Sequence, residues 1–204
     1  MEEIWSKVTS TLNLDATASQ IWLEKLKERY NDTTVRHYHT EDEMLKSKLA
    51  YLVDQKPSVV LAVLFQYYEL DSQGNSIEMN CQAFKEFCKD TALNDENLVQ
   101  HVLRLLGDPS ANVFDIEDDL NFLQDLDLVY LSSSAEDFRR QRELLRLEYK
   151  QMNDKQYNSM RLKFLETFLN VLPCIYSTTQ FREQFEEAAK ANITAEVEEL
   201  KALV

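Results

Sequence analysis

Cysteine and glycine form many binding sites that can be recognised in a sequence, such as zinc sites and phosphate-binding loops. In this chain both residues are too few and too widely spaced to form such a site. Cys81, Cys88 and Cys174 are odd in number and include no C-x-x-C pair, so they indicate neither a disulfide framework nor a zinc site. The two glycines, Gly74 and Gly107, stand alone in the sequence. Phosphate-binding loops and dinucleotide fingerprints need several closely spaced glycines, so both kinds of site are excluded.

The elements that would position any remaining site are predicted to be helices. Apolar residues recur at intervals of three and four along most of the chain. The segment from Ser58 to about Leu70 is apolar almost all round, which predicts a central helix buried on every side. A looser acidic segment is expected up to about Leu131. The other predicted helices lie around residues 21–26, from Thr40 to near Pro57, 77–88, 98–106, and from Ser134, Asp154 and Thr179 onward.

Composition supports an all-α fold. Two glycines and three prolines in 204 residues are too few for the turns of sandwiches and barrels. Gly107 followed by Pro109 is typical of a helix end. Neither an internal repeat nor an interdomain linker is evident. We therefore predict a single helical domain over residues 1–204, with residues 1–15 as a candidate N-terminal extension.

The charge of the chain restricts its partners. It has 36 acidic and 22 basic residues and a formal net charge of −14, which repels nucleic acid and anionic membranes. The longest apolar run, Val59 to Phe65, is too short to span a bilayer. The first residues lack the basic and apolar regions of a signal peptide. We expect an intracellular protein, cytoplasmic or nuclear, with no membrane or nucleic-acid partner.

Basic residues are concentrated in one part of the chain. Residues 139–163 contain eight bases against three acids, whereas residues 105–138 contain nine acids and no Lys or Arg. Such runs are usually solvated faces, and two adjacent blocks of opposite sign are also able to neutralise each other in the fold.

Four segments, taken in order, resemble the HD-domain metal-dependent phosphohydrolase superfamily, and more narrowly its small predicted-phosphohydrolase branch. They are Arg36-His37-Tyr38-His39-Thr40, residues 61–67, residues 122–128, and residues 146–149 with their continuation to residue 193. The resemblance covers roughly residues 30–200. It implies an HD-like helical bundle in which His and Asp side chains bind one or two metal ions that activate water against a phosphate ester.

The metal-binding residues that this resemblance implies are incomplete. His39 corresponds to the first ligand and Asp127 to the last, with Asp125 as a close second. Gln66 and Tyr67 stand where the superfamily has its His-Asp pair. Gln offers only a neutral amide oxygen, and Tyr, with a pKa near 10, is a neutral phenol at pH 7. We therefore expect no metal cofactor and no catalytic residue. We expect Tyr67, together with Tyr68, to fill part of the former metal cavity, with His39 or Asp127 as the hydrogen-bond partner of the buried hydroxyl. The alternative is a weakly held divalent metal such as Mn or Fe.

Each remaining residue of this site also has a structural interpretation. Arg146 and Arg161 would grip phosphate in an active relative, or they pair with carboxylates such as Glu148 or Asp127. His39 is also interpreted as a hydrogen-bonded histidine before a helix, and Asp125 and Asp127 as helix-terminal or solvated acids. Thr40 and the three acids after it have the pattern of a capping box.

The resemblance and its departures together predict a function. We expect a catalytically inactive HD-like pseudoenzyme that acts as a protein-interaction or scaffold subunit. The alternatives are a residual metal-dependent phosphohydrolase and a sensor of a nucleotide or another phosphate ligand. Both alternatives would use what we call the remnant pocket, which comprises His39, Gln66, Tyr67, Asp125, Asp127, Arg146 and Arg161.

Overall fold

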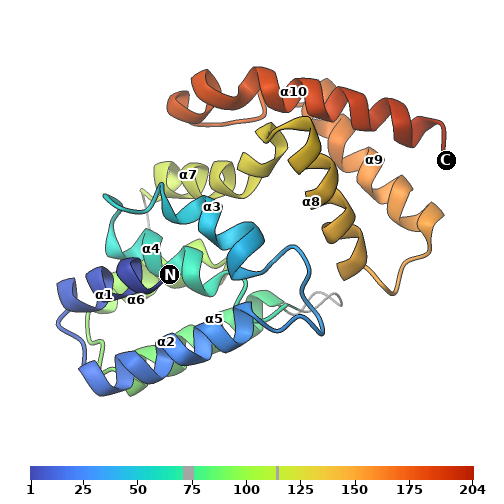
Figure 1. Cartoon of the computed structure of the whole chain (residues 1–204). Helices are drawn as coiled ribbons and strands as arrows, with labels where there is room; N and C mark the ends of the chain where they lie inside the picture. The colour runs from blue at the N-terminus through green and yellow to red at the C-terminus, as the bar shows by residue number, and fades with distance from the viewer. Residues whose placement is uncertain (71–75, 114) are drawn as a thin grey trace. The chain divides into compact units, whose positions relative to one another are not determined.

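The computed structural model describes residues 1–70, 76–113 and 115–204, and within these ranges every regular element is a helix and there is no strand (Figure 1). The prediction of an all-α fold is confirmed. None of the described helices is both long and apolar enough to cross a membrane. The chain divides into two compact units, residues Met1–Leu120 and Asn121–Val204. The single HD-like domain stays a prediction, and Gly74 lies outside the described residues.

The first unit contains six α-helices and a π-helical turn within the described residues, before α7 (Glu117–Leu128) runs across the boundary between the units. These elements are α1 (Glu2–Thr11), α2 (Ala16–Tyr30), η1 (Glu41–Leu45), α3 (Lys46–Leu49), α4 (Pro57–Phe65), α5 (Ser76–Asp90) and α6 (Glu96–Leu105).

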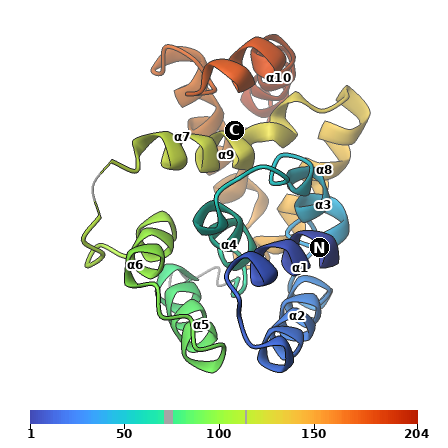
Figure 2. The same ribbon diagram turned by 90° about the vertical axis from the view of Figure 1, so that its left-hand side faces the viewer.

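Helix α4 forms the centre of the first unit. Its residues from Ser58 to Phe65 are all buried, and α1, α5 and α6 pack against it. Figure 2 shows α4 with α1 and α2 to one side and α5 and α6 to the other. The Phe65 ring lies 5.9 Å from Trp22, 5.4 Å from Phe84 and 5.3 Å from Phe87, so the end of α4 closes an aromatic core. The buried central helix was predicted correctly, but it ends at Phe65 and does not reach Leu70.

Three parts of the helix prediction need correction. The helix that begins after Thr40 ends at Leu49, and tight turns then carry the chain to Pro57 and leave Val53 48% exposed. Residues 1–15 contain α1, whose Trp5 is buried and donates its indole N–H to Ser19 O of α2 at 3.0 Å. The acidic segment expected to be loose is helical from Glu117, because its three leading acids face the positive end of the α7 dipole.

The second unit contains the rest of α7, a short 3-10 turn η2 (Val129–Ser132), α8 (Ala135–Glu148), α9 (Asp154–Asn170) and α10 (Thr179–Lys201). Helix α10, drawn in red in Figure 1, packs against α9 and η2. The predicted helix starts near Ser134 and Thr179 agree with the structure. The cap of α9 is Asn153 rather than Asp154, because Asn153 and Gln156 form a reciprocal capping box.

Candidate functional site

The first unit holds three residues of the remnant pocket, and two of them are in contact. The rings of His39 and Tyr67 lie 4.5 Å apart between centroids and are tilted by 36°. Tyr38 meets His39 edge-on at 5.1 Å, and Lys48 Nζ lies 5.0 Å from the Tyr67 ring. Gln66 is the C-cap residue of α4, directly before Tyr67. The Tyr67 ring therefore lies beside the His39 ring. The filled metal cavity stays a prediction.

A buried arginine that sequence reasoning missed brings these residues together. Arg36 is 2% exposed and donates to the backbone oxygens of Tyr67 at 2.7 Å, Tyr68 at 2.8 Å and His39 at 3.3 Å. It thereby ties the segment before η1 to the end of α4. The sequence did contain a sign of its importance. Arg36 is the first residue of the segment that contains His39 and resembles the HD-domain superfamily.

Asn80 of α5 supports the same turn from the other side. Its buried amide donates to Gln66 O at 2.6 Å and accepts from Glu69 N at 2.7 Å. The Thr40 hydroxyl accepts from Glu43 N at 3.2 Å, which gives the expected N-cap at the start of η1. Arg36, Asn80 and Thr40 therefore hold the chain around His39 through hydrogen bonds to the backbone.

In the second unit, Asp125 binds the loop that leads into α10. It is 1% exposed, and its two carboxylate oxygens accept from Ser177 N, Thr178 N and Thr178 Oγ1, each at 2.7 Å. Glu186 of α10 accepts from the two preceding amides, Ile175 N at 3.0 Å and Tyr176 N at 3.2 Å. Two buried carboxylates therefore bind four consecutive backbone amides. Asp127 lies two residues after Asp125 and is half-buried.

The two arginines of the remnant pocket are engaged within the second unit. Arg146 donates to Tyr149 O at 3.0 Å, Met152 O at 2.9 Å and Asp154 Oδ1 at 2.7 Å, which joins the end of α8 to the start of α9. Arg146 is therefore paired with a carboxylate, which is the structural alternative to gripping phosphate.

Arg161 is the more deeply buried of the two, with 6% exposure. It makes a bidentate pair with Glu196 at 3.0 Å for both contacts, and it donates to the Tyr130 hydroxyl at 2.9 Å. Burial alone would lower the pKa of Arg161, but Tyr130 and Glu196 outweigh it and raise the pKa above its usual value. The guanidinium stays charged and committed to this pair.

A resident divalent ion needs charged or strongly donating ligand atoms that are free to bind it. Gln66 and Tyr67 provide neutral oxygens, and both oxygens of Asp125 already accept from backbone amides. Within the ranges that the structure describes, no three His, Cys, Asp or Glu side chains are grouped so as to hold a metal. His39, Gln66 and Tyr67 belong to the first unit, and the other four residues belong to the second.

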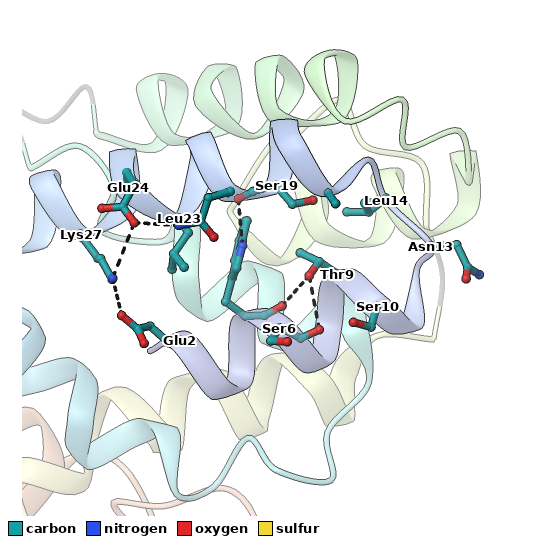
Figure 3. Close-up of a pocket in the computed structure, with 13 residues that line it drawn as sticks. Glu2, Ser6, Thr9, Ser10, Asn13, Leu14, Ser19, Leu23, Glu24 and Lys27 are labelled. Carbon is teal, nitrogen blue, oxygen red and sulfur yellow. Dashed lines mark hydrogen bonds and ion pairs between the residues drawn. The ribbon is translucent and has the colours of Figure 1, made fainter.

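An open groove of about 810 Å³ lies between α1 and α2 and contains none of the predicted site residues (Figure 3). Six of its thirteen lining residues have hydroxyl or amide side chains, and Lys27 pairs with Glu2 and, at 3.7 Å, with Glu24. The hydrogen bond to Lys27 lowers the pKa of Glu2. No spacing in the sequence pointed to this groove, because its residues are ordinary helix-surface types.

Comparisons with protein-family models, with curated proteins and with solved structures find no match to this chain. The resemblance to HD-domain phosphohydrolases therefore stays a hypothesis.

Proposed function

We propose that this chain is a catalytically inactive, HD-like protein that acts by binding a protein partner. The observation that carries the proposal is the loop of residues 175–178, where Asp125 and Glu186 bind four consecutive amides. Backbone amides before a helix N-terminus are a favourable place for a phosphate group. Here the chain's own carboxylates fill that place.

A phosphate ester would have to displace both carboxylates to use these amides. Asp125 and Glu186 are 1% and 6% exposed, so an incoming anion would meet two buried negative charges rather than free N–H donors. Like charges at such close range disfavour each other strongly. The loop therefore favours a structural role over substrate binding.

The contacts of the other remnant-pocket residues agree with this proposal. Arg146 and Arg161, the two groups that would grip phosphate, are paired with Asp154 and Glu196. Tyr67 lies against His39, where a metal-binding site would need an open coordination position. A hydrolase or a phosphate sensor would require several of these contacts to break, whereas a protein that binds a partner through its surface requires none.

The test is a metal and phosphate titration of the whole purified chain. We expect calorimetric titrations with Mn²⁺, with Fe²⁺ and with inorganic phosphate to show no saturable binding, and we expect hydrolysis of phosphomonoesters and phosphodiesters at the buffer rate. His39→Ala is the matched variant. Stoichiometric metal binding, together with hydrolysis that His39→Ala abolishes, would establish the residual phosphohydrolase instead. Saturable phosphate binding without turnover would establish the sensor.

A further inference from the structure

Helix α9 buries a narrow strip of its surface and leaves the rest more exposed. In seventeen residues it buries a single row of side chains, Tyr157, Arg161 and Leu165. Next to this row lie four apolar side chains at helical spacing, which we name the α9 stripe: Met160, Phe164, Phe168 and Val171. Phe164 is 41% exposed, Val171 is 73% exposed, and the other two are half-buried. The stripe is about 16 Å long, which is three helical turns.

The aromatic part of the α9 stripe is held in a defined orientation. The rings of Phe164 and Phe168 meet edge-to-face at 5.0 Å and 81°. The guanidinium of Arg161 lies 5.4 Å from the Phe164 ring, and Arg161 is itself fixed by Glu196. Ordered aromatic side chains lose little entropy on binding and often supply most of the energy of an interface.

The free charges on α9 are cationic. Asp154 at its start is paired with Arg146, and Glu166 is paired with Lys201 at 3.0 Å. Lys155 and Lys163 are exposed and make no ion pair with the described part of the chain. Lys163 directly precedes Phe164 in sequence. In a chain of net charge −14, an unpaired lysine beside an exposed apolar stripe favours an acidic partner.

We propose that the α9 stripe binds an amphipathic helix of a protein partner, with Asp or Glu residues flanking its apolar face to meet Lys163. Three turns of apolar side chains at intervals of three and four residues match the spacing that one helix presents to another. A second copy of this chain would bring two charges of −14 together, and nucleic acid would leave the stripe uncovered. This inference rests on the proposed function and specifies the chemistry of the partner.

The test uses two fluorescein-labelled helical peptides with the same leucine stripe, one flanked by Glu and the other by Lys. Fluorescence anisotropy with the whole chain should show binding of the Glu peptide alone, weakened by added salt. Phe164→Ser should weaken that binding about tenfold and Lys163→Glu about threefold to tenfold. Ile21→Ser is the control, because Ile21 is 53% exposed on α2 of the first unit. Circular dichroism checks that each variant keeps its helices.

This inference would be overturned by equal binding of the two peptides, by an equal loss in Ile21→Ser, or by sedimentation that shows self-association abolished by Phe164→Ser. Binding of an RNA oligonucleotide in place of the Glu peptide would also contradict it. The metal and phosphate titration is independent of the peptides. A negative peptide result with no metal or phosphate binding removes this inference alone, whereas metal-dependent hydrolysis removes the proposed function.

Discussion

The two units bury an arginine in two different ways. In the first unit, Arg36 donates to three backbone oxygens, and its hydrogen-bonding partners in those contacts are neutral. In the second unit, Arg161 makes a bidentate pair with the buried carboxylate of Glu196. Both residues are buried, Arg36 at 2% and Arg161 at 6% exposure. The contrast teaches that a buried charge is stabilised either by backbone dipoles or by an opposite charge. Removing the arginine is expected to lower the free energy of unfolding by different amounts in the two cases.

The same contrast extends to the neighbouring polar residues. The neutral amide of Asn80 braces the turn after α4, whereas the carboxylates of Asp125 and Glu186 brace the loop before α10. Removing a partner of a charge pair leaves an isolated buried charge, and this costs more than leaving a neutral carbonyl without a donor.

The largest effect is expected at the charge pair. Arg161→Met should lower the free energy of unfolding by about 3–5 kcal/mol, because Glu196 is then buried without a counter-ion. The double variant Arg161→Met with Glu196→Leu should recover most of that loss, because two apolar side chains of similar size need no partner. Urea denaturation measures both values. A double variant no more stable than the single one would show that the pair has no such coupling.

A smaller effect is expected at Arg36. Arg36→Met should destabilise the protein by about 2–3 kcal/mol, since three backbone oxygens lose their donor. Hydrogen exchange should rise first around residues 66–69, where Arg36 and Asn80 hold the turn after α4. An Arg36→Met variant that loses as much stability as Arg161→Met would remove the distinction between the two units.

The smallest effect concerns acid sensitivity of the first unit. Hydrogen bonds from the Ser110 hydroxyl and amide, with Lys85 at 3.1 Å, lower the pKa of Asp108 to about 2. A lowered folded-state pKa means that the unfolded chain binds more protons, so stability is present above the unfolded pKa and falls as the pH drops from about 4 to about 2. The loss should be about 1–2 kcal/mol. Asp108→Asn should flatten this part of the pH–stability curve, and an unchanged curve would assign the sensitivity to other carboxylates.

Local features of the fold were predictable because their causes are local. Gly107 has a φ of +96° at the end of α6, and Thr40 caps η1 through its hydroxyl, both as their positions in the sequence indicated. The apolar run from Ser58 predicted a buried α4, and the structure ends that helix at Phe65.

The contacts of the candidate site were not predictable in the same way. Asp125 binds amides 52 and 53 residues away, and Arg161 binds a carboxylate 35 residues away. Spacing along the chain carries no information about partners at such distances. The sequence named Asp125 and Arg161 only as candidate residues of the remnant pocket, and the packed helices reveal the groups that they bind.

The loop of residues 175–178 has a consequence for the order of folding. Its amides acquire their Asp125 partners only when a chain segment of about fifty residues has closed, and closing such a segment has an entropic cost before any contact compensates for it. Helix α8 and helix α9 are joined by short-range contacts such as Arg146 with Asp154, eight residues apart. We therefore expect the start of α10 to become ordered late on the folding pathway, after the connection between α8 and α9 has formed.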